Sequence, residues 1–151
     1  MDKALVVYDE DDTELLAEAG ELAAGVDAKL FVLSLLTADE FADARETLDV
    51  VAQEEHTSYD DEVVLDVAKR EAREGAEETF GDLELDWQAV GARIGDDETA
   101  ASRIIDVAED RDVDHVFLTG QQRSPTGKAV FGDRTQAVIL NFDGPVTTLL
   151  Q

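Results

Sequence analysis

The sequence predicts an α/β fold: a single domain over residues 1–151, with an open, mostly parallel five-stranded sheet and helices on both faces. Two observations carry this expectation. Short apolar runs alternate along the chain with segments of helical periodicity, an order that is typical of parallel sheets. The length of 151 residues suits one domain, and the apolar share of 44% is enough for a hydrophobic core.

The first two strands are expected at two apolar runs near the start of the chain. The run 5–8 ends in acidic residues and is typical of a buried strand. Thr13 then offers N-cap chemistry for a helix whose apolar residues recur at helical spacing up to Gly25. The run 29–36 predicts the second buried strand.

The crossover after the second strand is expected to be long. Apolar residues fit one helical face over 41–52 and another over 64–80, and the polar stretch 56–61 lies between them. This pattern indicates either one broken helix or two helices. Strict alternation over 83–89 predicts a third strand with one exposed face, typical of a sheet edge, and 91–97 is expected to be a loop.

The last third of the chain predicts two more helix–strand units. Apolar residues at helical spacing over 101–108 predict an amphipathic helix, and the run 116–118 predicts the fourth strand. Another helix is expected to begin near Gly132 and to break at Gly144. The run 146–150 is then the fifth strand.

Ligands of open parallel sheets bind beyond the carboxyl ends of the strands, near the point where the strand order reverses. This places Asp9, Leu36 and the segment from Gly120 onward at the candidate site. Asp9 is the first residue past the first strand and is the candidate for a contact with a base or Mg²⁺. The acids that follow are interpreted as helix caps and solvated surface: Asp11, Asp12 and Glu14.

The charge of the chain excludes several partners. Lys and Arg number 12 against 37 Asp and Glu, which gives a formal net charge of −25. A surface this negative repels nucleic-acid phosphates and anionic membranes. Screening by salt relieves the self-repulsion, since the Debye length falls to about 3 Å at 1 M. The composition therefore suggests a protein of a salt-rich cytoplasm.

The chain has no cysteine, so disulfides, thiolate metal sites and cysteine nucleophiles are excluded. The N-terminal residues lack the length and cleavage pattern of a signal peptide. No stretch approaches the roughly 20 apolar residues of a membrane span. A cytoplasmic location is therefore expected.

The segment 120–134 is a basic island in this acidic chain. It has three basic residues against one acid and holds three of the ten glycines. Because it follows a strand and leads into a helix, backbone N–H groups and the helix dipole favour an anion there. Two interpretations remain open: a phosphate cradle that includes Gly127 and Lys128, or a Gly/Pro loop whose cations pair with neighbouring acids.

Two nucleotide-binding motifs are absent. Gly127-Lys128 lacks the earlier glycine of a Walker loop, and Ala129 stands where the Ser or Thr that holds Mg²⁺ would be. The first strand is not followed by Gly-x-Gly-x-x-Gly, so the dinucleotide fingerprint is missing too.

Taken together, the order of elements, Asp9, the long second crossover, the loop after the fourth strand and the short last strand resemble the universal stress protein family over essentially the whole chain. Nucleotide-binding members carry Gly-x-x-Gly, nine residues, then Gly-Ser/Thr. Gly120 and Gly132 match the first and last glycines, with the spacing one residue short. Arg123 replaces the second glycine and Asp133 the Ser or Thr. The stretch 123–132 resembles the haloarchaeal branch of the family.

The resemblance implies a Rossmann-like fold, similar to adenine nucleotide alpha hydrolases, with strand order 3-2-1-4-5. It also implies a homodimer, paired through the last strand, Val146 to Leu150, because an unpaired apolar edge is a liability. Asp9 and the backbone at Leu36 would meet an adenine. The ribose would be approached by Thr119, Gly120 and Gln122, and the phosphates would be flanked by Arg123, Gly132, Asp133 and Arg134.

Three functions follow as alternatives. The first is a cytoplasmic stress-response regulator that binds ATP or AMP, with Mg²⁺ as a candidate companion. The second is a dimeric protein-interaction module whose degenerate site binds no nucleotide. The third and weakest is a slow ATP hydrolase, because no base, nucleophile or metal cage is visible. His56, His115 and Trp87 are interpreted as structural or surface residues, so no catalytic residue and no metal ligand is expected.

Overall fold

The structure is a computed structural model that describes residues 1–55, 61–120 and 131–150. Its five strands form one sheet in the order β3-β2-β1-β4-β5, and all four pairings are parallel. The strands are β1 (Lys3–Val7), β2 (Lys29–Leu36), β3 (Trp87–Arg93), β4 (His115–Thr119) and β5 (Val146–Leu149). The expected α/β class and strand order are therefore confirmed.

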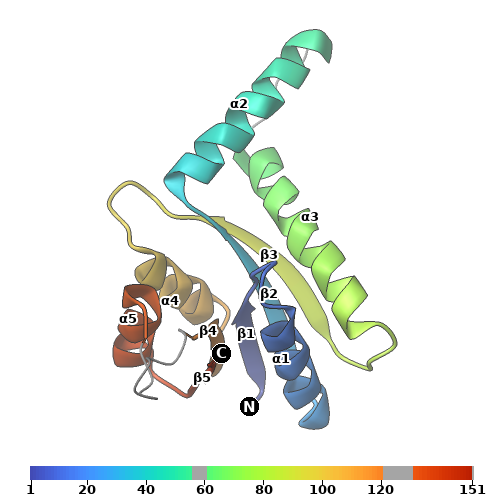
Figure 1. The fold of residues 1–151 in the computed structure, drawn as a ribbon, viewed down its shortest axis with the longest axis vertical. Coiled ribbons are helices and arrows are strands. Elements are labelled where there is room, and N and C mark those ends of the chain that lie inside the picture. Colours follow the sequence, from blue (N-terminus) through green and yellow to red (C-terminus); the bar gives the residue numbers. More distant parts are fainter. Residues whose placement is uncertain (56–60, 121–130, 151) are drawn as a thin grey trace.

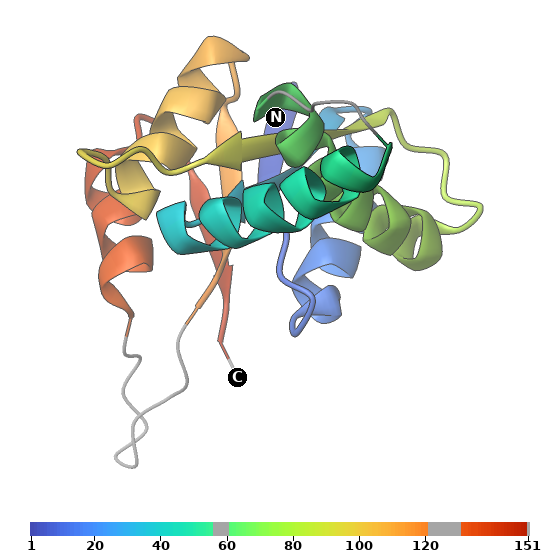
Figure 2. The same cartoon turned by 90° about the horizontal axis from the view of Figure 1, so that it is seen from above.

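Five helices connect the strands: α1 (Thr13–Gly25), α2 (Ala38–Glu55), α3 (Asp61–Phe80), α4 (Ala100–Asp110) and α5 (Asp133–Asn141). α1 and α3 lie on one side of the sheet, and α4 and α5 lie on the other (Figures 1 and 2). α2 extends away from the rest of the molecule (Figure 1). The long second crossover therefore holds two helices.

The sheet separates two hydrophobic clusters. Leu5 and Val7 of β1 belong to the cluster under α4 and α5, called here the α4/α5 face. Ala4 and Val6 belong to the cluster under α1 and α3, the α1/α3 face. The alternation follows from the period of two along a strand, and all four residues are buried because the central strand is covered on both sides.

The third strand begins later than its sequence pattern predicts. Pairing to β2 starts with Leu30 opposite Trp87 and continues to Leu36 opposite Arg93. The alternating residues from Leu83 onward are extended but not in the ladder, and Leu83 is 37% exposed. The placement over 83–89 is wrong by about four residues, because alternation reports an extended chain and not its pairing.

Gly91 was expected in a loop and lies instead inside β3. A Cβ atom there would meet the backbone oxygen of Leu65 at 2.6 Å. The glycine therefore lets α3 cross close over the strand, as glycines inside strands often do. The helix start was also misassigned: the N-cap of α1 is Asp12, whose side chain accepts a hydrogen bond from Leu15 N, and Thr13 is the first helical residue.

Candidate nucleotide-binding site

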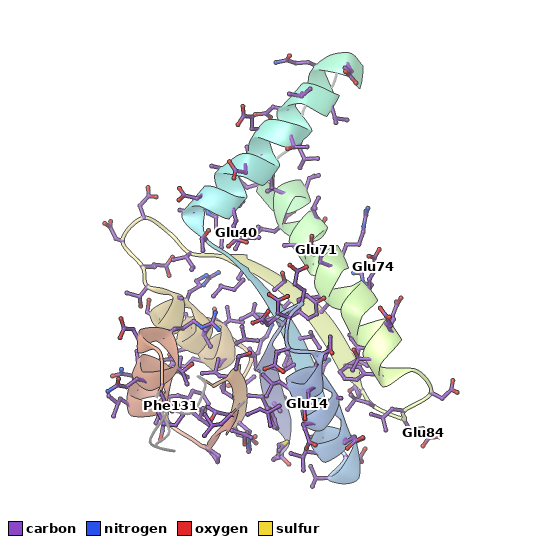
Figure 3. All side chains as sticks on the ribbon, viewed as in Figure 1. Glu14, Glu40, Glu71, Glu74, Glu84 and Phe131 are labelled. Carbon is purple, nitrogen blue, oxygen red and sulfur yellow. The ribbon has the colours of Figure 1, made fainter. Side chains whose placement is uncertain are left out.

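A cavity of about 380 Å³ opens at the carboxyl ends of β1 and β2. Four groups of residues line it: 8–11 after β1, 34–36 at the end of β2, Glu40 and Glu71 from α2 and α3, and Arg134 from α5. Glu40 lies at the start of α2 and Glu71 on α3 (Figure 3). Segments far apart in sequence therefore meet beside the strand-order reversal between β1 and β4, where ligands of such sheets bind.

The turn after β1 fixes the position of Asp9. Asp12 N donates to Asp9 O at 3.0 Å, and Asp11 N donates to Asp9 Oδ1 at 3.0 Å. Asp12 then caps α1 through Leu15 N at 3.1 Å. Asp9 is held at the cavity wall by this turn, and Asp12 serves the helix, as the sequence indicated for that residue.

Two buried oxygens near this end of the sheet have no hydrogen-bond partner among the described residues: Asp12 Oδ2 and Thr119 Oγ1. Asp12 is only 4% exposed. Buried polar atoms of this kind are normally satisfied by water or a ligand group.

The end of β2 forms the second wall. The Leu36 carbonyl accepts a hydrogen bond from Ile94 N at 2.9 Å, so one backbone group at this position is already paired. Thr37 and Glu40 form a reciprocal capping box: Glu40 N donates to Thr37 Oγ1 at 3.1 Å, and Thr37 N donates to Glu40 Oε1 at 3.2 Å. The box holds the Glu40 carboxylate at the cavity.

The end of β4 is built differently. Thr135 Oγ1 donates to Thr119 O at 3.0 Å, and Gly120 N donates to Leu149 O at 3.1 Å. A Cβ at Gly120 would lie 2.8 Å from that same oxygen, so glycine is needed for the close approach of β5. Neither Thr119 nor Gly120 is among the residues that line the cavity.

The start of α5 closes the arrangement. Gly132 is its N-cap and supplies no side-chain hydrogen bond, and Asp133 in the first turn is exposed. Arg134 reaches the cavity. Cationic side chains and open helix N–H groups suit an anion. The sequence-based candidates Gln122, Arg123, Gly127 and Lys128 lie outside the described residues.

Of the sequence-based candidates, the cavity therefore joins Asp9, Leu36 and Arg134. Other lining residues were missed. Ser34 and Leu35 could have been found by the argument that led to Leu36. Glu40 carried a signal in Thr-x-x-Glu, the capping-box pattern. Glu71 carried none, because its place depends on how α3 crosses the sheet.

The described cavity wall carries negative charge. The pKa of the Tyr8 phenol is raised from its ordinary value, first by burial and then by the carboxylates of Glu10, Glu71, Asp9 and Glu78. Burial disfavours a charged phenolate, and nearby negative charges disfavour it further. Any anion at this wall meets the same field.

The residues interpreted as structural have protein partners. His115 shares a 2.7 Å hydrogen bond with Thr147 Oγ1 and stacks on Phe117. Trp87 packs edge to face on Phe80, with ring centroids 5.8 Å apart. His56 lies outside the described residues. Within the described ranges, no group of three or more His, Cys, Asp or Glu side chains is placed to hold a metal ion.

An open parallel sheet with a polar cavity at its carboxyl end defines a doubly wound α/β protein, a class whose ligands bind at that end of the sheet. A comparison with known families matches residues 1–149 to the Universal stress protein family. The chain belongs to that family.

Solved structures share this fold at low sequence identity. The universal stress protein UspA from Lactobacillus plantarum has a TM-score of 0.66 at 17% identity, with 98% of this chain and 97% of that chain covered. The universal stress protein from Archaeoglobus fulgidus has a TM-score of 0.58 at 20% identity, with 98% of each chain covered. A universal stress protein from Archaeoglobus fulgidus in complex with dAMP has a TM-score of 0.55 at 16% identity, with 98% of this chain and 97% of that chain covered.

No protein with curated annotation matches the chain. Among its described helices, none is both long and apolar enough to cross a membrane.

Proposed function

We propose that this chain is a stress-response regulator that binds an adenine nucleotide at the carboxyl end of its sheet and catalyses no reaction on it. The observation that carries the proposal is the cavity that joins Asp9, Leu36 and Arg134 from three distant segments. The dAMP complex of the Archaeoglobus fulgidus protein supports it, because a protein of this fold and family holds a nucleotide.

Different described residues would contact the base and the phosphate of the nucleotide. The Asp9 carboxylate and the backbone of 34–36 offer polar groups to the edge of a base. Arg134 and the first turn of α5 offer positive charge to a phosphate. Where Mg²⁺ accompanies ATP, the phosphates would carry it, with Asp133 as the candidate protein ligand.

A regulator of this kind works by population shift. The nucleotide favours one conformer or one partner complex over another, and the size of the shift is set by the difference in affinity. We place the protein in the cytoplasm. Its 37 acidic against 12 basic residues support an interior rich in salt, as in the haloarchaeal branch.

The test is thermal unfolding of the protein in molar KCl, titrated with ATP plus Mg²⁺ and, separately, with AMP. A ligand at a hundredfold excess over its Kd stabilises the folded state by about 2.7 kcal/mol. Arg134→Ala should lose most of this gain. Arg73→Ala, an exposed arginine of α3 that does not line the cavity, should keep it.

Absence of a saturable shift at millimolar nucleotide would defeat the proposal. The chain would then be the alternative, a protein-interaction module that binds no nucleotide. A shift followed by slow release of phosphate from ATP would instead indicate the weak hydrolase.

We also propose a homodimer through β5. Within the described ranges the strand pairs only with β4, and its residues Val146–Leu149 are all half-buried at the sheet edge. The carbonyl of Pro145 accepts a hydrogen bond from Val116 N of β4, and that of Leu149 accepts one from Gly120 N just after β4. By alternation the backbone groups of Thr148 therefore point outward. A second copy can pair there.

Thr148→Pro removes one outward N–H without removing a bond to β4, because proline is tolerated at an edge. Light scattering after size exclusion in molar KCl should find a dimer for the unchanged protein and a monomer for the variant. A monomeric unchanged protein would contradict the proposed dimer.

A further inference from the structure

The described part of the cavity wall carries a net negative charge, which does not match the charge of a polyphosphate. Among the described residues, its wall carries five carboxylates and one cation. The carboxylates are Asp9, Glu10, Asp11, Glu40 and Glu71, and the cation is Arg134. This wall opposes an incoming anion.

Ion pairing does not neutralise these carboxylates within the described part of the chain. The two ion pairs found there both belong to Arg45, which contacts Asp49 at 3.5 Å and Asp61 at 2.8 Å. The acids of the wall bond to neutral backbone groups instead: Asp9 accepts from Asp11 N, and Glu40 accepts from Thr37 N. Such bonds orient a carboxylate and leave its charge in place.

The wall continues beyond the cavity as an acidic surface. Tyr8 and Glu10 also line two adjoining hollows on the α1/α3 side of the molecule, together with Glu74 and Glu78 of α3. Glu14, Glu71 and Glu74 can be followed in Figure 3. The pKa of Tyr8 is raised first by burial and then by the carboxylates of Glu10, Glu71, Asp9 and Glu78, which agrees with a negative potential here.

We propose that this cavity selects against phosphate charge: its ligand is a nucleoside or nucleoside monophosphate, and its affinity for a triphosphate rises with salt concentration. The inference rests on the proposed adenine-nucleotide site. To that proposal it adds how many phosphates the ligand carries and how the affinity for a triphosphate changes with salt. Both follow from the carboxylates of the wall.

The physical reason is screened repulsion. In water, two like unit charges about 8 Å apart lower a binding constant roughly twofold. A triphosphate brings several charges to a wall with several carboxylates, so the factors multiply. The Debye length falls from about 10 Å at 0.1 M to about 3 Å at 1 M, which removes most of this repulsion. At a cationic site the affinity for a triphosphate would fall as salt is raised, because salt weakens the attraction between opposite charges.

The test is calorimetric titration of the full chain with adenosine, AMP and ATP, without divalent ions, between about 0.3 M and about 3 M KCl. Circular dichroism at each salt concentration confirms that the protein is folded. Adenosine is uncharged, so its Kd should stay nearly constant. The Kd of ATP should rise by roughly tenfold as KCl is lowered across this range.

A variant locates the effect. Glu71→Gln removes one charge from the wall at nearly constant size, and should lower the ratio of the ATP Kd to the adenosine Kd about twofold at low salt. The control is Glu77→Gln on the same helix, an exposed residue that does not line the cavity. Equal effects of the two variants would assign the repulsion to the overall charge of the protein and overturn the inference.

The remaining outcomes separate this inference from the proposed function. One outcome is that adenosine binds and that ATP binds more tightly as salt is lowered. The nucleotide site would then exist, but its cations would outweigh its carboxylates, and only this inference would fail. If none of the three ligands binds at any salt concentration, the proposed function fails and the inference with it.

Discussion

The two faces of the sheet are packed by different kinds of residue. On the α4/α5 face, the buried residues are mostly branched aliphatics such as Ile104, Val107, Leu118 and Val138. On the α1/α3 face, the helices contribute mainly alanines, among them Ala19, Ala23, Ala72 and Ala76. Large side chains fill the α4/α5 face, whereas small residues let the helices of the α1/α3 face approach the sheet closely.

Close approach on the α1/α3 face extends to its glycines. A Cβ at Gly20 would lie 2.5 Å from the ring of Phe80, and one at Gly75 would lie 2.6 Å from the ring of Tyr8. Small residues therefore let two aromatic rings sit directly on helix backbones. Because Tyr8 lines the candidate cavity, the packing of this face also shapes the site. The comparison predicts that the α4/α5 face is sensitive to truncation and the α1/α3 face to enlargement.

Ile104→Ala should give the largest loss. Ile104 is fully buried on the α4/α5 face, and truncating such a residue costs about 2–5 kcal/mol of unfolding free energy. Denaturant unfolding at fixed KCl measures it. Ile105→Ala, at a partly buried position of the same helix, is the matched control and should cost less. Equal losses would mean that α4 does not pack as described.

The next largest loss of unfolding free energy is expected for Gly20→Ala, which adds a methyl group at a buried position. The new methyl collides with Phe80, and overpacking of this kind costs about 1–3 kcal/mol. Gly25→Ala is the control, because a Cβ there meets nothing within 4 Å and a helical Gly→Ala change is favourable by about 0.5–1 kcal/mol. Adding Phe80→Leu should recover part of the Gly20→Ala loss. Independent, additive effects would contradict the close contact.

The Tyr8 phenol should titrate above its ordinary pKa, because burial and the acids around it disfavour the phenolate. The folded state holds this proton more tightly than the unfolded chain. Stability from Tyr8 is therefore present below the unfolded pKa of 10.0 and is lost as pH rises through the higher folded pKa. Ultraviolet absorbance of the phenolate measures the pKa in a Tyr59→Phe background, which leaves Tyr8 as the only tyrosine.

Glu71→Gln in that background should lower the pKa of Tyr8, while Glu77→Gln should not. An unchanged pKa in both would show that the Glu71 carboxylate does not contribute to the raised pKa.

The smallest effect is expected at Leu140. Although it is a leucine of α5, it is 72% exposed, whereas Val138 two positions earlier is fully buried. Leu140→Gln should therefore change the unfolding free energy by no more than about 0.5 kcal/mol. Val138→Ala should cost clearly more, as thermal unfolding will show. A loss of similar size at Leu140 would mean that another surface covers it in solution.

Most of the fold could be predicted from the sequence, because the three central strands are mainly apolar and the helices carry a helical period of apolar residues. The errors came where local pattern and tertiary contact differ. Leu83 continues an alternation that has no pairing partner, and Gly91 is required by the crossing of α3 and not by a turn. Neither fact is encoded within a few residues of sequence.

The candidate site was less predictable. Asp9 follows β1 and Leu36 is the last residue of β2, so the carboxyl-end rule locates both directly. Glu71 reaches the cavity only through the tertiary placement of α3, and Glu40 through a capping box that also serves its own helix. The sequence motif emphasised glycines and cations of the loop after β4, whereas the described wall is made mainly of carboxylates.

The parallel pairing of β1 has a consequence for how the chain folds. β1 pairs with β2 on one side and with β4 on the other, where Leu5 lies opposite Val116, 111 positions later. During synthesis β1 is made before both of its neighbours, and the edge that β4 will cover stays open until the 111 positions between Leu5 and Val116 have been added. Pairings this distant in sequence slow folding and expose apolar edges meanwhile.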